Sequence, residues 1–210
     1  MNVMSLLVLG AGGHAASCID VIEAEGRFTI AGLVGSAAES GKQLLGYAVL
    51  GTDADLPALV ARHRRALIAI GHLRTADPRI HLFARLQQLG CELPSIVSPL
   101  ARISRHATVG AGTIVMHGAL VNAGAVVGRN CIINSHALVE HDAVIGDHCH
   151  IATAAVVNGG VRVGCGTFVG SNATLRQSVT IGERCVIGMG ERLLTDRAPG
   201  TSPVPEKRRP

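Results

Sequence analysis

The sequence predicts a chain in three parts: an α/β domain over residues 1–98, an all-β parallel β-helix over residues 99–194 and a tail over residues 195–210. Two patterns and the composition predict this division. The first part alternates apolar runs of strand length with helix-like segments, which is typical of a parallel α/β sheet. The second part repeats a six-residue pattern without a break. Hydrophobic residues make up 48% of the chain but aromatic residues only 2%, so Val, Ile, Leu and Ala must build the core.

The elements of the first part follow each other in a regular order. The apolar run SLLVLG leads into GAGGHAASCIDVIEAEG, a glycine turn that opens a helix, and a second apolar run, FTIAGLVG, comes next. After a variable stretch to Asp55, the pattern predicts a helix in LPALVARHR, a strand in ALIAIG and a helix in ADPRIHLFARLQQLG. PSIVSP then closes the domain. Strands that alternate with helices favour a small parallel sheet.

The turn from Gly10 to Ala15, GAGGHA, is close to the dinucleotide fingerprint of Rossmann-like domains. Glycines at such a turn let backbone N–H groups approach a phosphate at the N-terminus of the next helix. A dinucleotide site also needs an acidic residue where the second strand ends, and Val34 and Gly35 stand there. A nicotinamide cofactor is therefore disfavoured. The phosphate of an activated sugar is the preferred interpretation, and a tight turn without a ligand is the alternative.

The second part repeats in units of six. From Ile103 to Ile187 the first residue of all fifteen hexads is Ile, Val or Leu, and the fifth is mostly small or slender. Because six is an even number, a strand period of two keeps each hexad position on one face. A coil of three sides takes eighteen residues, with the first and fifth residues of each hexad inward. Fifteen hexads then make five coils of a triangular prism, about 24 Å tall at roughly 4.8 Å per layer.

Composition disfavours several classes of function. A net charge of +4 with so few aromatic residues does not suit nucleic acid, which proteins bind through basic surfaces and stacking aromatic rings. No apolar run reaches the roughly 18 residues of a membrane span. The N-terminus shows no basic leader, and the six cysteines form no CxxC pair. These features predict a cytoplasmic protein with buried free thiols.

One polar segment interrupts the aliphatic repeat: VEHDAVIGDHCH, residues 139–150. An imidazole, with its ordinary pKa near 6.5, suits a general base, and a carboxylate on its other ring nitrogen fixes the tautomer. His141 lies between two acids, Glu140 and Asp142. In a flat strand both acids would face away from His141, but a corner of the prism can relax that restriction. A catalytic base is the sharper hypothesis, and a merely solvated polar corner is the alternative.

The order of these motifs resembles one family. GAGGH, then AIG at Ala69 to Gly71, then a hexad repeat that carries EHD, is similar to the hexapeptide-repeat sugar acyltransferases related to bacillosamine N-acetyltransferase and sialic acid O-acetyltransferase. The resemblance covers nearly the whole chain. It implies a left-handed prism, a homotrimer, acetyl-CoA in the groove between neighbouring prisms and a nucleotide-linked sugar on the front domain.

The resemblance also implies roles for single residues. His141 corresponds to the general base and Asp142 to its orienting acid, with Glu140 as a second candidate. Acceptor binding falls to Gly12, Gly13, His14 and Gly71, and Asn134, about one hexad before the base, is a further candidate. His150, Ser171 and Met189 fall where the family binds acetyl-CoA. The family's acidic pair after the second strand has no counterpart in LVGS at residues 33–36. The identity of the nucleotide, and whether one is bound, therefore stays open.

We therefore expect transfer of acetyl from acetyl-CoA to the amine of a nucleotide-linked amino-dideoxy sugar, by direct attack and without an acyl-enzyme. O-acetylation of sialic acid or another sugar hydroxyl is the alternative within the class. A zinc lyase of the hexapeptide-repeat carbonic anhydrase type is a rival, because His136 and His141 have the right spacing. Its third histidine would stand at position 100, which is Leu, so no metal is predicted. A non-catalytic trimeric scaffold is the last alternative.

The C-terminal segment echoes the family's closing turn, with Val204 to Lys207 as the counterpart of Pro-Ala-(Lys/Arg). Its basic end, Lys207 to Arg209, is predicted either to meet the phosphates of the coenzyme or to be solvated.

Overall fold

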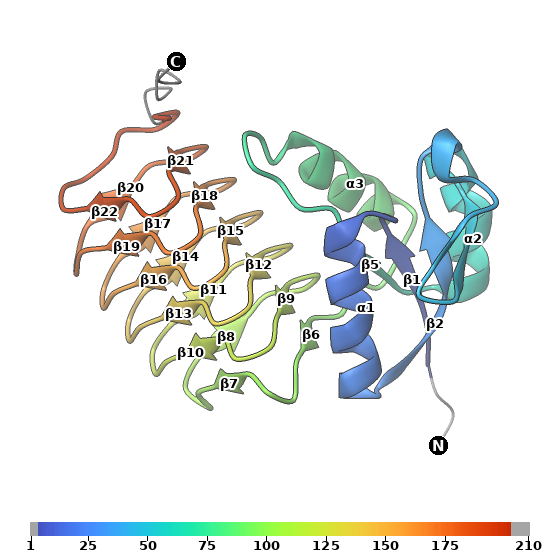
Figure 1. The fold of residues 1–210 in the computed structure, drawn as a ribbon, viewed down its shortest axis with the longest axis horizontal. Helices are drawn as coiled ribbons and strands as arrows, with labels where there is room; N and C mark the ends of the chain where they lie inside the picture. Colours follow the sequence, from blue (N-terminus) through green and yellow to red (C-terminus); the bar gives the residue numbers. More distant parts are fainter. Residues whose placement is uncertain (1–3, 203–210) are drawn as a thin grey trace, which may run out of the picture.

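The computed structural model describes residues 4–202 and shows a layered α/β part beside a prism of short strands (Figure 1). The closing segment predicted from Val204 onward lies outside the described residues. The chain passes from the first part into the second once, and the two parts lie against each other along α1 and α3. Within residues 4–202, no helix is both long and apolar enough to cross a membrane.

The α/β part contains a five-stranded sheet in the order β3-β4-β2-β1-β5. All neighbours are parallel except β3 and β4, which form an antiparallel hairpin at one edge. The strands are β1 (Met4–Leu9), β2 (Phe28–Val34), β3 (Gln43–Leu44), β4 (Tyr47–Gly51) and β5 (Ala66–Ile68). The helices are α1 (Gly13–Glu25), α2 (Leu56–His63) and α3 (Asp77–Gln88), with 3-10 turns η1 (Ala37–Glu39) and η2 (Asp53–Asp55).

Helices cover both faces of this sheet. On one face α1 packs on β1 and β2 and, on its other side, on the prism strands, so that one apolar cluster joins the two parts of the chain. On the other face α2 and α3 enclose a second cluster, with Leu56, Phe83 and Leu86 at its centre. The three predicted strands and three predicted helices of this part are all present. The hairpin of β3 and β4 was not predicted, because it is short and only Val49 in it is buried.

The prism consists of strands of two residues each, arranged in three walls of six, five and six strands. The strands are β6 (Ile96–Val97), β7 (Arg102–Ile103), β8 (Thr108–Val109), β9 (Ile114–Val115), β10 (Leu120–Val121), β11 (Val126–Val127), β12 (Ile132–Ile133), β13 (Leu138–Val139), β14 (Val144–Ile145), β15 (His150–Ile151), β16 (Val156–Val157), β17 (Arg162–Val163), β18 (Phe168–Val169), β19 (Thr174–Leu175), β20 (Thr180–Ile181), β21 (Val186–Ile187) and β22 (Arg192–Leu193). Together they form a left-handed parallel β-helix of the kind that the resemblance implied.

We call the three walls the docking wall, the second wall and the third wall. The docking wall, β6-β9-β12-β15-β18-β21, faces α1 through outward residues such as Ile114 and Ile132. The second wall is β7-β10-β13-β16-β19-β22, and the third wall is β8-β11-β14-β17-β20. The chain turns from the second wall to the third at the outer corner, which is the corner opposite the docking wall.

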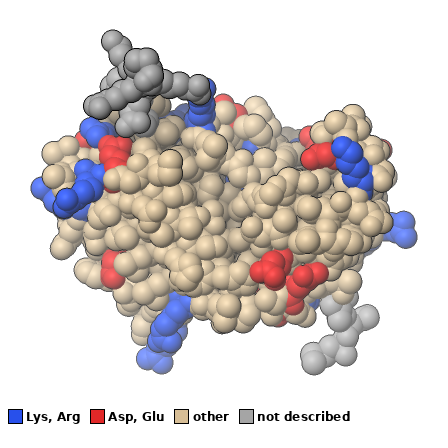
Figure 2. Space-filling model, viewed as in Figure 1, with Lys and Arg blue, Asp and Glu red and all other residues tan. Residues whose placement is uncertain are grey.

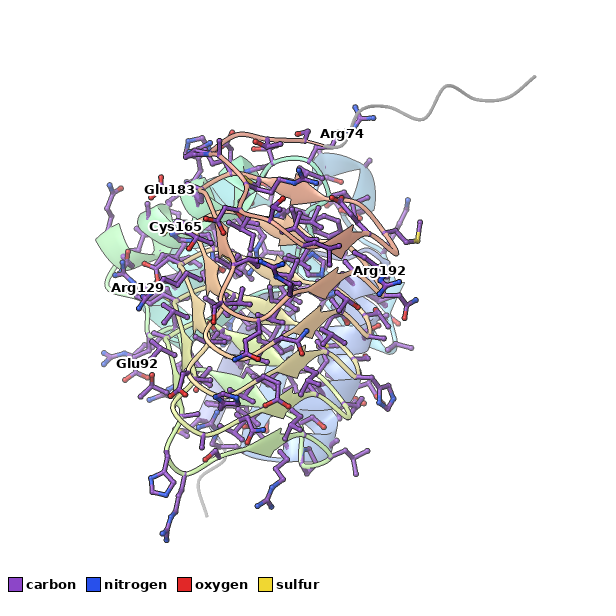
Figure 3. All side chains as sticks on the ribbon, turned by 90° about the vertical axis from the view of Figure 1, so that its left-hand side faces the viewer. Arg74, Glu92, Arg129, Cys165, Glu183 and Arg192 are labelled. Atoms are coloured by element: carbon purple, nitrogen blue, oxygen red, sulfur yellow. The ribbon has the colours of Figure 1, made fainter. Side chains whose placement is uncertain are left out.

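Register within each wall follows the predicted eighteen-residue coil. Leu138 pairs with Leu120 below it and with Val156 above it, and the other strands pair in the same way. Side chains of equivalent positions therefore stack along the edges of the prism, as Arg129, Cys165 and Glu183 do in Figure 3. The first and fifth residues of the hexads form one continuous core, as predicted. Strand β22 lies inside the predicted range 99–194, and β6 adds one strand to the ladder just before that range.

Corners of the prism depend on one backbone conformation. From Gly112 to Gly190 the fourth residue of each hexad has a positive φ, which runs from 52° at Asn130 to 63° at Ser178 among residues other than glycine. This left-handed region is sparsely populated by L-residues, and glycine and asparagine adopt it most readily. Cys165, at a third position, is exposed, while the other five cysteines are buried. The prediction of buried thiols is therefore wrong for Cys165, because third positions point outward.

A buried arginine holds the two parts of the chain together. Arg79 of α3 is fully buried, and its Nη1 donates hydrogen bonds to the carbonyls of Ile68 and Ile70. Its Nη2 donates to the carbonyl and to Oδ1 of Asn130 in the prism, both at 2.8 Å. Burial lowers the pKa of Arg79 to about 10, so the guanidinium remains charged at neutral pH. No carboxylate among residues 4–202 forms a salt bridge with it.

Charged side chains are dispersed on one face of the molecule (Figure 2). On the face shown in Figure 2, lysine and arginine side chains stand in small separate groups and do not merge into one basic surface.

Replacing Arg79 by Leu should destabilise the protein by about 3–5 kcal/mol, because buried acceptors on both parts of the chain lose their donor. Urea unfolding followed by circular dichroism measures this loss. Arg85→Leu on the same helix is the control, since Arg85 is partly exposed, and its effect should stay within about 0.5 kcal/mol. Equal losses for the two variants would contradict the role given to Arg79.

Candidate active site

The outer corner between β13 and β14 carries the polar segment singled out in the sequence. Asp142 occupies the fourth hexad position, with φ at 60°, and this turn brings its side chain back to its neighbour. Its Oδ2 lies 2.9 Å from Nδ1 of His141. Glu140 instead accepts hydrogen bonds from the His141 backbone N–H at 3.1 Å and from Asn122 Nδ2 at 3.0 Å. Asp142, not Glu140, is thus the acid that contacts the imidazole ring.

The ring of His141 is open to solvent, with 57% of the side chain exposed. The hydrogen bond to Asp142 raises the pKa of His141, and the charges of Asp142 and Glu140 add to the effect. Because Nδ1–H donates to Asp142, Nε2 is the nitrogen that can take a proton from a reacting group. The corner thus presents a base that is oriented by a carboxylate and accessible from outside.

Two glycines make room for this pair. A Cβ on Gly159, eighteen residues after His141, would lie 2.6 Å from His141 Nε2, so the ring rests directly against the glycine. A Cβ on Gly124, eighteen residues before Asp142, would lie 2.4 Å from Asp142 Oδ1. Both contacts follow from the stacking of coils. The orientation of the pair therefore depends on the absence of side chains in the coils above and below.

A cavity of about 630 Å³ opens at the carboxyl edge of the front sheet. Four of the predicted acceptor residues line it: Gly12, Gly13, His14 and Gly71. Two acids, Glu39 and Asp53, line it as well, although no motif pointed to them. Asn134, the fifth predicted acceptor residue, lies outside the lining.

The N-terminus of α1 opens into this cavity. Gly12 is the N-cap, no side chain caps the helix, and no acidic residue stands in its first turn. Free N–H groups and the helix dipole make such an end an anion-binding site. The buried Arg79 adds positive charge behind the cavity, because it is hydrogen-bonded to the carbonyl of Ile70, a lining residue.

Buried histidines lie where the front domain meets the docking wall. His150 is 6% exposed, and its Nδ1 lies 2.9 Å from the carbonyl of His72, to which it donates. Its Nε2 lies 3.3 Å from Nδ2 of Asn134. Burial lowers the pKa of His150 to about 3 and that of His14 to about 4, so both rings are neutral. Within one chain His150 has no free ring N–H, so its predicted contact with the coenzyme stays a prediction.

Ser171 and Met189 lie at the corner between the docking wall and the second wall, and Met189 is 81% exposed. The predicted site residues thus fall into three groups: the cavity, the outer corner with Glu140 to Asp142, and this last corner with the neighbouring Asn134 and His150. One chain brings each group together but does not bring the cavity to His141, because the docking wall stands between them. Among residues 4–202, no three His, Cys, Asp or Glu side chains gather closely enough to hold a metal ion.

Comparisons with known proteins agree with this architecture. Residues 5–83 match the family described as the PglD N-terminal domain, and residues 160–190 match the bacterial transferase hexapeptide family. No curated protein sequence matches the chain. Fold and repeat therefore define a transferase of the hexapeptide-repeat class.

Three solved structures indicate which hexapeptide-repeat transferases this chain is similar to. The chain is 33% identical to PerB from Caulobacter crescentus, solved with CoA and GDP-perosamine, with a TM-score of 0.88 over 94% of this chain and 92% of that one. A perosamine N-acetyltransferase variant from the same organism, with one histidine changed to asparagine, is 32% identical over the same shares, with a TM-score of 0.89. The acetyltransferase domain of PglB from Neisseria gonorrhoeae, solved with acetyl coenzyme A, is 29% identical with a TM-score of 0.87, over 94% of both chains. The chain belongs to the family of hexapeptide-repeat sugar acetyltransferases, as its motifs predicted.

Asp142→Asn should lower the pKa of His141 toward the ordinary histidine value near 6.5, because the main cause of the raised pKa is removed. NMR titration of the His141 ring proton measures this. Glu140→Gln is the control and should shift the pKa less, since Glu140 contacts only the backbone of His141. A larger shift in the control would contradict the assignment of Asp142 as the orienting acid.

Proposed function

We propose that the protein transfers the acetyl group of acetyl-CoA to the amine of a nucleotide-linked amino-dideoxy sugar. The observation that carries the proposal is the outer corner, where His141 is held by Asp142 with Nε2 open to solvent. The anion-binding end of α1 in the front cavity supports a phosphate-bearing acceptor. Similar proteins are solved with CoA and GDP-perosamine, which supports both co-substrates.

The chemistry requires no covalent enzyme intermediate. The sugar amine attacks the thioester carbonyl carbon, a C–N bond forms, and the proton lost by the nitrogen passes to His141 Nε2. The C–S bond then breaks, and the coenzyme thiolate takes that proton back and leaves as free CoA thiol. Asp142 fixes the tautomer before attack and stabilises the imidazolium that forms between the two steps.

The oxygen of the thioester carbonyl gains negative charge during attack and needs a donor. The backbone N–H of Gly159 is a candidate for this donor. At the equivalent positions in the two preceding coils, the N–H groups of Ala123 and His141 donate to the side chains of Asn122 and Glu140. Asn158 turns its amide to the Leu175 carbonyl instead, and the N–H of Gly159 has no acceptor among residues 4–202. Gly159 rests against the His141 ring, so its N–H is close to the proposed base, which suits an oxyanion site.

The proposal includes a homotrimer. The cavity and His141 lie on different sides of the docking wall, so a second copy must bring an acceptor to the base. On the second wall, which ends at the outer corner, the outward residues Leu120, Leu138 and Val156 are apolar and only partly buried. Contact between copies at this wall would cover them and place acetyl-CoA next to Ser171 and Met189 of one copy. A cytoplasmic location, where acetyl-CoA is made and used, belongs to the same proposal.

His141→Ala should lower kcat by about 10²- to 10⁴-fold, because the base is lost. Release of CoA thiol from acetyl-CoA measures turnover, with nucleotide-linked amino sugars and free sialic acids offered as acceptors. His106→Ala, an exposed histidine at the same outer corner two coils below Asp142, is the control and should keep full activity. Turnover only with sialic acid would replace N-acetylation by O-acetylation, and full turnover of the His141 variant would remove it as the base.

Gly159→Ala should lower kcat by about 10- to 100-fold while the protein remains folded, because the methyl group displaces the His141 ring. Alanine itself fits a third hexad position, as Ala123 shows. Gln177→Ala, one coil further on at the same corner, is the matched control and should keep full activity, since Gln177 is exposed. In a His141→Ala background, Gly159→Ala should cause little further loss in thiol release, and an undiminished loss there would show that the methyl group acts elsewhere.

A further inference from the structure

A carboxylate stands at the end of β2 although the sequence has none there. β2 ends at Val34, and Gly35 and Ser36 follow. Glu39, the last residue of η1, folds back so that its Oε2 accepts hydrogen bonds from the backbone N–H and from Oγ of Ser36, both at 2.8 Å. These two bonds form a capping box and hold the carboxylate in one place.

Gly35 gives this carboxylate its position. A Cβ on Gly35 would lie 3.0 Å from Glu39 Oε2 and 3.2 Å from Glu39 Cβ. The Glu39 side chain thus occupies the space where a side chain of residue 35 would begin. In parallel sheets with a glycine turn after the first strand, an acid at the end of the second strand binds ribose hydroxyls. Glu39 supplies that acid in space, five residues after the strand ends in sequence.

The neighbouring strand carries the same arrangement, but there the capping acid does not line the cavity. β4 ends at Gly51, and Asp55 Oδ2 accepts from the Thr52 N–H at 2.8 Å and from its Oγ1 at 3.1 Å. A Cβ on Gly51 would lie 2.7 Å from Asp55 Oδ2. Asp55 does not line the cavity, whereas Glu39 does. The capping box holds both carboxylates, but only that of Glu39 lines the cavity, where it can meet a ligand.

The cavity has two chemically different ends. The uncapped N-terminus of α1, at Gly12 and Gly13, offers donors to an anion. Glu39 offers an acceptor, since its Oε1 receives no hydrogen bond from residues 4–202. Hydrogen bonds to Ser36 lower the pKa of Glu39, so the group is ionised at neutral pH. A nucleoside diphosphate has the matching polarity, with phosphates at one end and ribose hydroxyl donors beyond them.

We propose that Glu39 binds the ribose hydroxyls of the acceptor's nucleotide and so selects ribonucleotide-linked sugars over deoxyribonucleotide-linked ones. A carboxylate accepts from both hydroxyls of a vicinal diol, and such charge-assisted bonds are stronger than neutral ones. The inference rests on the proposed function in one respect, the placement of the nucleotide in the front cavity.

Asp53 is the competing acid. It lines the same cavity from η2, but it is exposed and no residue among 4–202 holds its carboxylate with a hydrogen bond. Glu39 is preferred because two bonds to Ser36 fix it at the end of β2. Asp53→Asn is therefore part of the test.

The experiment compares Glu39→Gln with Asp55→Asn in the full chain. Both variants remove one charge from the same kind of capping box, and glutamine still caps at this position. Calorimetry measures the Kd of GDP against 2′-deoxy-GDP, and of UDP against 2′-deoxy-UDP. Wild type and Asp55→Asn should bind the preferred ribonucleotide about tenfold more tightly than its deoxy form, and Glu39→Gln should bind both forms equally and more weakly.

Each outcome bears on the proposal. Tenfold discrimination retained in Glu39→Gln, or lost in Asp53→Asn instead, would overturn it while leaving the acetyltransferase activity in place. Absence of any nucleotide binding by the wild type would overturn the nucleotide placement and the role of Glu39 together. Thiol release with amino sugars reports separately on the acetyl transfer, so the two failures are distinguishable. Thermal unfolding of each variant shows whether weaker binding comes from lost folding.

Discussion

The eighteen-residue coil is the constraint on which the rest of this structure depends. Each coil passes three corners, and the fourth residue of the hexad takes a positive φ there so that the first and fifth residues stay in the core. Equivalent residues of successive coils are then held one above the other. The contact of Asp142 with His141, and the glycines that flank the pair, are consequences of this register. The geometry of this pair is thus set by the stacked coils and not by a long loop.

The pKa of histidine is shifted in opposite directions at two places in this structure. His14, His72 and His150 lie where the front domain covers the docking wall, and burial lowers their pKa values to between about 3 and about 4. His141 stands at the corner farthest from that contact, where a carboxylate raises its pKa. The packing of the two parts therefore leaves a basic imidazole on the outside and neutral ones in the seam.

Arg79 shows how closely the two parts depend on each other. Its guanidinium fixes the carbonyls before and after Ala69 in the front domain and reaches Asn130 in the prism. Removing a charge from water at this depth is costly, and the four acceptors around it offset that cost. Arg79 and the apolar cluster between α1 and the docking wall therefore fix the front domain on the prism together.

Much of the fold and of the candidate site could be predicted from the sequence, because the patterns that indicate them are local or periodic. The hexads predicted the prism and its inward residues, the glycine turn predicted the strand-to-helix site, and the EHD element pointed to the corner that holds His141. The start of the ladder was predicted slightly too late, because β6 precedes the first full hexad. Apolar outward residues at Ile96, Ile114 and Ile132, eighteen apart, were a signal for the docking wall that the hexad pattern alone did not use.

The tertiary structure decided the contacts that form where the backbone turns back on itself. In a flat strand, the side chains of His141 and Asp142 would point to opposite faces. The positive φ of Asp142 at the corner brings them into contact. The second strand ends without an acid in the sequence, and only the turn of η1 over Gly35 brings Glu39 there. The separation of the cavity from His141 depends on which wall packs on α1. By itself, the sequence determined the scaffold and the chemical types of its site, because these follow from periodicity and residue identity. The tertiary structure decided which groups meet, because contacts across corners, turns and walls follow from backbone conformation and packing.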